Sequence, residues 1–274
     1  MSLSHRMIQR APRPGLRGLV DRLSAYRADG TGSANSRQAA RPVLPLIVNF
    51  GPGYDIALGS GAASRHEAGF VAGLFAGPVN ILTPAGAESV QVDLTPLGAA
   101  CFWGGAGADL AGRMAGLDDM IGAEGARLRD RLAATDDWWL RLDLAEAFVA
   151  GRLRHRPSAA VLHACRRITR AGGDLRIGVL ADEIGWSRRH LANRFRAEIG
   201  TTPKLLARLI RFDRAQRLSR GGSSGGWADI AAACGFTDQA HLVREFRALA
   251  GDSPGAWHHA NRSAQVTKPQ DGGR

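Results

Sequence analysis

The feature that most constrains the fold of this chain is a motif that occurs twice in its C-terminal third. The first copy runs from Ala181 through Gly185, Trp186, Ser187, Leu191, Phe195 and Gly200 to Pro203, and the second runs from Ala231 through Gly235, Phe236, Thr237, Leu242, Phe246 and Gly251 to Pro254. In both copies Phe, Gly and Pro are spaced by five and then three residues, whereas the step from the first Gly to Phe is ten residues in one copy and eleven in the other. Similarity of this kind within one chain predicts a repeated structural unit.

Each copy has the sequence features of a helix-turn-helix. A small Ala lets two helices approach, a Gly follows the first helix, and Ser187 or Thr237 with Asp238 can cap the second. At about 100° per residue, the apolar residues of the second helix fall on one side, as Leu191 and Phe195 do in the first copy. One side of each second helix is therefore expected to pack against the rest of the unit.

The opposite sides of these second helices carry mostly polar residues. They are Arg189, Asn193 and Arg196 in the first copy and Ala240, His241, Arg244 and Arg247 in the second. Arg and Gln can read guanine and adenine edges, Asn and His can add hydrogen bonds, and Ala can meet a thymine methyl group. These faces are predicted to enter a groove of DNA.

A linker helix is predicted between the two copies. It starts at Pro203, which suits a first turn, and carries apolar residues at Leu205, Leu206, Leu209, Ile210 and Phe212. About 17 residues of helix span roughly 26 Å. Together with the width of the helices that it joins, this spacer could hold two recognition helices about one DNA turn, roughly 34 Å, apart.

Charge divides the chain into regions with different partners. Residues 1–41 contribute +6 (8 Arg, 2 Asp), residues 42–150 contribute −7 (6 Arg, 13 acids), and residues 151–274 contribute +12 (22 Lys and Arg, 10 acids), giving the net +11. A strongly basic C-terminal region favours a polyanionic partner. The excess over residues 1–41 fits either a flexible tail that assists DNA capture or the solvated start of the first domain.

The N-terminal half has the pattern of a β-rich unit followed by helices. Short apolar runs bounded by Gly and Pro predict strands over 43–50, 69–75, 78–84 and 89–96. From Leu110 onward, apolar residues recur at three- and four-residue spacing, which predicts helices. The expected fold class is α+β. The expected domains are a basic tail (1–14), a β-rich domain (15–110), a helical segment with a linker (111–156), a DNA-binding domain (157–260, with helix-turn-helix units at about 177–199 and 227–250 and a linker helix at about 203–220) and a flexible tail (261–274).

Residues 157–260 resemble the DNA-binding domain of the AraC/XylS transcription regulators. The resemblance rests on ADEIGWSRRHLANRF, on LIRFDRAQRL in the linker helix and on IAAACGFTDQAHLVREFRALAGDSP. It implies a sequence-specific regulator that binds two adjacent major-groove segments of double-stranded promoter DNA. The base-reading positions that it implies are Arg189, Ala192, Asn193, Gln239, Ala240, His241 and Arg244. Candidates for phosphate contact are Ser187, Arg188, Arg196, Lys204, Arg208, Thr237 and Arg247, although a solvated helix face explains Arg208 equally well.

The N-terminal half resembles the cupin-like domains that precede such modules, through PVLPLIVNFG, GLFAGPV and VDLTPLGA followed by FWG. In relatives this domain senses a small molecule or dimerises. The implied partners are therefore promoter DNA, a small-molecule effector of unknown identity and, as further candidates, RNA polymerase and a second copy. No cofactor and no metal is expected, because His66 with Glu67 is an isolated pair and not the ligand set of a metal-holding cupin.

Two other classes of protein stay open at this level. An enzyme, such as a cupin-type catalyst or a DNA-repair methyltransferase, needs metal ligands or an activated Cys, and Cys101, Cys165 and Cys234 lie far apart without a Cys-x-x-Cys pair. Cys101 could serve as a redox sensor, but a buried position in an apolar strand is the more frequent case and is the one expected here. A non-specific architectural protein would protect DNA independently of its sequence.

The cytoplasm, with association to the nucleoid on DNA binding, is the expected location. No apolar run reaches the roughly 18–20 residues that cross a bilayer, and Arg and Pro occupy the place of a signal peptide's apolar stretch.

Overall fold

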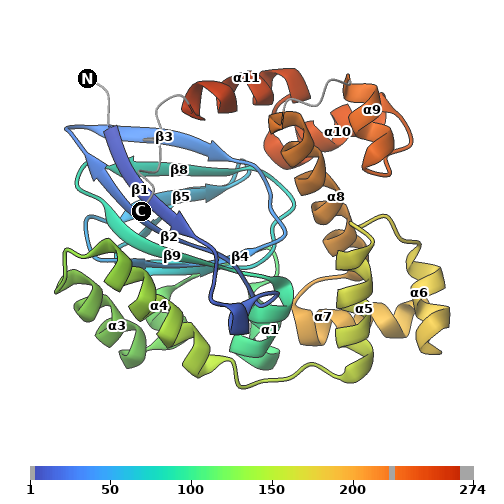
Figure 1. Cartoon of the computed structure of the whole chain (residues 1–274), viewed down its shortest axis with the longest axis horizontal. Coiled ribbons are helices and arrows are strands. Elements are labelled where there is room, and N and C mark those ends of the chain that lie inside the picture. Colours follow the sequence, from blue (N-terminus) through green and yellow to red (C-terminus); the bar gives the residue numbers. More distant parts are fainter. Residues whose placement is uncertain (1–3, 222–225, 266–274) are drawn as a thin grey trace.

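The structure is a computed structural model that describes residues 4–221 and 226–265. A β-rich N-terminal half lies beside a helical C-terminal half (Figure 1). Within the described residues all strand pairs are antiparallel and form two sheets. The first has the order β1 (Ser4–Arg10), β2 (Val20–Asp29), β9 (Glu88–Leu94), β4 (Leu44–Asn49), β7 (Gly69–Ala72) and β10 (Met114–Gly116), and the second has the order β3 (Ser33–Gln38), β8 (Val79–Pro84), β5 (Tyr54–Leu58) and β6 (Ser64–His66).

The central strands of the first sheet are buried on both faces. On β9, Val90, Val92 and Leu94 are at most 1% exposed, and Asp93 between them is also 1% exposed. The reason is that helices α3 (Ala123–Ala133) and α4 (Trp138–Arg152) cover the outer face of this sheet (Figure 1). The expected α+β fold, with a β-rich domain followed by helices, is confirmed.

Residues 96–110 differ from the expected β-rich character. They form helix α1 (Pro96–Trp103) and the 3-10 helix η2 (Gly104–Leu110). The local cause is a helix start, because the Thr95 hydroxyl accepts a hydrogen bond from the Gly98 amide at 3.0 Å and Pro96 occupies the first turn. The expectation for Cys101 was therefore wrong: it lies half-buried in α1 and not in a strand.

Two further segments correct the expected boundaries. Residues 4–10, assigned to the basic tail, form strand β1 and pair with β2, and the Arg10 guanidinium donates to the carboxylates of Asp143 and Glu146 on α4 at 2.8 and 2.7 Å. This part of the basic segment is thus the start of the first domain. Strand β10 interrupts the predicted helical region before α2 (Leu117–Ile121). A short 3-10 helix, η1 (Pro14–Leu16), joins β1 to β2.

The C-terminal half consists of helices that surround α8 (Pro203–Arg220), which contacts α5, α7, α9, α10 and α11. Their bounds are α5 (Ala159–Arg170), α6 (Ile177–Ile184), α7 (Arg188–Ile199), α9 (Trp227–Ala233), α10 (Gln239–Ala250) and α11 (Pro254–Gln265). The rings of Phe212 on α8 and Phe246 on α10 lie 4.9 Å apart, and both residues are fully buried. Part of the expected C-terminal tail, residues 261–265, is the end of α11, and residues 266–274 lie outside the described chain.

The two halves share one apolar core, and two of the contacts between them involve the ends of α7 and α10. At the first, η2 packs against α7, and a Cβ at Gly200 would lie 2.7 Å from the carbonyl oxygen of Gly107. At the second, the Ala40 amide donates to the Leu249 carbonyl at 2.8 Å, and the Gln216 side-chain amide donates to the Ala40 carbonyl at 3.4 Å. The N-terminal half therefore holds the C-terminal ends of both α7 and α10.

Candidate nucleic-acid interface

The two repeated motifs fold into the same local structure. Gly185 and Gly235 have φ angles of +76° and +72°, which favour glycine, and each starts the turn between two helices. The next residue, Trp186 or Phe236, donates its amide to the carbonyl of the motif's alanine, Ala181 or Ala231. Two helix-turn-helix units are therefore present, α6–α7 and α9–α10.

The caps explain the extra residue in the second turn. Ser187 caps α7 by accepting a hydrogen bond from the His190 amide at 3.2 Å. In the second unit the cap is Asp238, one residue beyond Thr237, and it accepts from the His241 amide at 2.6 Å. The turn is lengthened by one residue without a change in the way that the second helix starts.

The predicted faces of α7 and α10 are arranged as expected. The apolar sides are buried, with Leu191, Phe195, Leu242 and Phe246 at 0% exposure. Among the predicted base-reading residues, Arg189, Asn193, Gln239, Ala240 and Arg244 are exposed, whereas Ala192 and His241 are half-buried. The exposed members lie on the side of each helix away from the core.

His241 is engaged by its own turn. Its Nδ1 lies 3.4 Å from the Thr237 amide nitrogen and from the Thr237 hydroxyl, and its Nε2 lies 3.9 Å from the Glu245 carboxylate. The imidazole also contacts the edge of Phe236, with ring centroids 5.4 Å apart. This position is more constrained than the motif alone suggests.

The predicted phosphate-contacting cations fall into two groups. Among the described residues, no carboxylate lies within ion-pair distance of Arg188, Arg196, Lys204 or Arg247. Arg208 differs, because its guanidinium donates to the Glu245 carboxylate at 2.6 Å and so joins α8 to α10. Sequence reasoning missed Glu245, although its spacing of four residues from His241 places both on one side of α10.

His66, which lies beside Glu67 in the sequence, has two neighbours in the structure. The His66 Nε2 lies 2.9 Å from the Ser64 hydroxyl, and its ring contacts Phe70. The described residues contain no cluster of three or more His, Cys, Asp or Glu side chains that could hold a metal ion. None of the helices in that part of the chain is long and apolar enough to span a bilayer.

Two helix-turn-helix units in tandem, each presenting a second helix with exposed arginines, define a DNA-binding protein. Comparison with known proteins agrees, because residues 180–260 match the family model described as a helix-turn-helix domain. Residues 180–260 thus form a helix-turn-helix domain by both sequence and structure.

Several solved structures are similar to this chain. ToxT from Vibrio cholerae is 9% identical with a TM-score of 0.47, over 94% of this chain and 98% of that one. The DNA-binding domain of AdpA, a global transcriptional factor solved with a target DNA, is 27% identical with a TM-score of 0.36, over 40% and 98%. The C-terminal domain of AraT, a response regulator from Geobacillus stearothermophilus, is 23% identical with a TM-score of 0.36, over 39% and 88%. No curated protein matches the sequence.

Proposed function

We propose that this chain is a transcription regulator of the AraC/XylS type and that it inserts the N-terminal halves of α7 and α10 into two adjacent major-groove segments of a promoter. The observation that carries the proposal is the pair of equivalent second helices, each with a capped start and an exposed polar face, joined by the single helix α8. With 18 residues, α8 is roughly 27 Å long. Such a spacer suits half-sites one turn of DNA apart.

Base reading is assigned to exposed side chains that can form directional hydrogen bonds. Arg189 and Arg244 suit the O6 and N7 acceptors of guanine, and Asn193 and Gln239 suit adenine. Ala192 and Ala240 offer only apolar contact, for example with a thymine methyl group. His241 lies on the same side of α10, and its weak contacts to Thr237 and Glu245 would orient its ring at the groove.

Phosphate contacts would come from the unpaired cations that flank these positions. They are Arg188, Arg196, Lys204 and Arg247, with Ser187 and Thr237 at the helix starts. Arg208 contributes less, because Glu245 already neutralises its charge. If about 6 to 10 phosphates are neutralised, affinity should fall roughly 10³- to 10⁵-fold between 50 and 200 mM salt.

The test begins with selection of preferred sites from a random DNA library, followed by affinity measurements at fixed salt. We expect Arg189→Ala and Arg244→Ala each to weaken binding by about 1–3 kcal/mol and to relax preference at one base pair. Arg131→Ala is the matched control, since it removes an exposed arginine from α3 and should leave affinity unchanged.

Two results would contradict the assignment. An equal loss for Arg189→Ala or Arg244→Ala across all sequences would identify those residues as phosphate contacts. A library that yields no preferred sequence would replace sequence-specific regulation by architectural binding.

The N-terminal half is proposed to receive the signal, a small molecule, because it touches both helix-turn-helix units. The cavity between its two sheets encloses about 130 Å³, which is small beside the roughly 300–1,000 Å³ of ordinary ligand sites. RNA polymerase and a second copy of the chain are further proposed partners, and binding to promoter DNA would place the protein in the cytoplasm at the nucleoid.

A further inference from the structure

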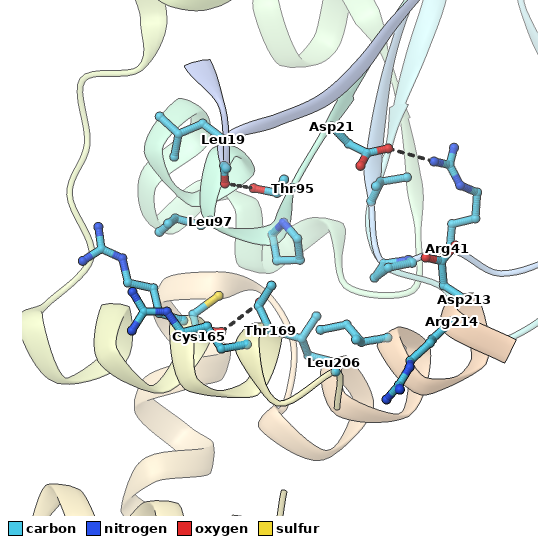
Figure 2. Close-up of a pocket in the computed structure, with 18 of the residues that line it drawn as sticks. Leu19, Asp21, Arg41, Thr95, Leu97, Cys165, Thr169, Leu206, Asp213 and Arg214 are labelled. Carbon is cyan, nitrogen blue, oxygen red and sulfur yellow. Dashed lines mark hydrogen bonds and ion pairs between the residues drawn. The ribbon is translucent and has the colours of Figure 1, made fainter. Parts of the chain in front are cut away.

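A larger cavity of about 620 Å³ lies between the two halves of the chain (Figure 2). One wall comes from the start of β2 and of α1, including Leu19, Pro96 and Leu97. The facing wall comes from α5 and α8, including Cys165 and Leu206. Its volume falls within the range of small-molecule sites, unlike that of the cavity between the sheets.

The middle of this cavity is apolar. Leu97 extends toward the cavity from the N-terminal half, and Cys165, Thr169 and Leu206 lie across the gap from it (Figure 2). Removal of an apolar group from water is favourable. The cavity therefore favours a ligand with an apolar body.

The lining charge is strongly unbalanced. Six arginines and two aspartates line the cavity, and both aspartates are already paired: Asp21 with Arg41 at 3.0 Å, and Asp213 with Arg217 at 2.8 Å. Within the described chain, the other four arginines have no carboxylate at ion-pair distance: Arg17, Arg166, Arg170 and Arg214. The cavity therefore has an uncompensated positive charge around an apolar floor, which favours an anion over a neutral or cationic molecule.

We propose that the cavity between the halves binds an organic anion with an apolar body, its acidic group on Arg166 and Arg170 of α5. A molecule bound there touches the N-terminal half and α8 together, and α8 joins the two helix-turn-helix units. If the anion prefers one relative placement of these elements, it shifts the population toward that placement and changes DNA affinity. This regulatory step rests on the proposed function, whereas the binding step does not.

Binding is tested with the full chain and three carboxylic acids that differ in their apolar part: 4-phenylbutyrate, octanoate and indole-3-acetate. The alcohol and the amine with the same body as each acid serve as neutral and cationic probes. We expect at least one acid to raise the melting temperature in a saturable way at up to 10 mM, and its alcohol and amine to have no effect. The proposal is overturned if no acid binds, or if an alcohol or amine binds as well as its acid.

Variants locate the site. Arg166→Ala with Arg170→Ala should weaken acid binding at least tenfold, whereas Arg127→Ala with Arg131→Ala should not, because that pair has the same spacing and exposure on α3. Thr169→Trp, which fills the cavity from an exposed position on α5, should also abolish acid binding. Unchanged acid binding in both α5 variants would overturn the assignment. The assignment would also be overturned if the ligand-free Arg166→Ala/Arg170→Ala protein bound DNA more weakly and still bound the acid normally. These two arginines would then be phosphate contacts.

Coupling to DNA is measured separately on the selected DNA site. The bound acid should change DNA affinity by at least about fivefold, and DNA should change the acid affinity by the same factor. Acid binding without this change would overturn the regulatory step alone. Acid binding by a protein that selects no DNA sequence would contradict the proposed function and leave the anion site standing.

Discussion

The contact between α7 and η2 can be tested with two glycines that share a backbone conformation and differ in surroundings. Gly185 ends α6 with φ +76°, and Gly200 ends α7 with φ +79°. A Cβ at position 185 would meet no atom within 4 Å, whereas a Cβ at position 200 would lie 2.7 Å from the carbonyl oxygen of Gly107. The comparison therefore separates backbone strain from the contact between the halves.

The expected magnitudes follow from these distances. Gly185→Ala should reduce the free energy of unfolding by about 1–2 kcal/mol, the cost of a left-handed non-glycine residue. Gly200→Ala carries the same cost plus about 1–3 kcal/mol, because the clashing atom belongs to the backbone and cannot rotate away. At roughly 2–4 °C per kcal/mol, the second variant should melt several degrees below the first.

The assay is thermal and urea unfolding of both variants, with hydrogen exchange followed over residues 104–110. We expect faster exchange of this segment in Gly200→Ala only, since that variant pushes η2 from α7. Equal losses of stability, or equal exchange in the two variants, would refute the close approach of Gly200 to Gly107.

Two further predictions concern buried groups. Asp93 is 1% exposed, and its carboxylate accepts a hydrogen bond from Arg41 at 2.6 Å. Arg41→Ala should therefore reduce the free energy of unfolding, measured by urea titration, by about 3 kcal/mol. The control Arg65→Ala breaks exposed ion pairs and should leave the free energy of unfolding unchanged. Equal losses of stability in the two variants would show that Arg41 does not stabilise the buried Asp93 carboxylate. Burial raises the pKa of the Cys165 thiol to about 12, so at pH 8 only about one molecule in 10,000 carries the thiolate, against roughly a quarter in the unfolded chain. Ellman's reagent should therefore modify Cys165 at least about 1,000-fold more slowly in the native protein than in guanidinium chloride, and comparable rates would contradict its burial.

The DNA-binding half was the more predictable part of the chain because its signals are local. The two motif glycines, the caps and the apolar spacing within each second helix all act over a few residues, and the structure has the helices where these signals place them. The one detail that local pattern left open was the second cap. Both Thr237 and Asp238 could serve, and the structure has Asp238.

The contacts between the halves could not be predicted, since they join residues far apart in sequence. Ala40 meets Leu249 through backbone atoms, which carry no signal in the side chains. Gly107 approaches Gly200 because neither has a Cβ, and glycines also occur at many ordinary turns. The residues around Cys101 were expected to form a strand, but Thr95 and Pro96 start a helix there instead.

The shared core and these two contacts have a consequence for engineering chimeras. An N-terminal domain from another protein cannot simply replace residues 4–152 of this chain, because the ends of α7 and α10 would lose the surfaces that they contact. A functional graft would have to carry over the backbone segment at Ala40 and the glycine at position 107 along with the new domain. For this protein, a domain can thus be exchanged only together with the residues that contact α7 and α10.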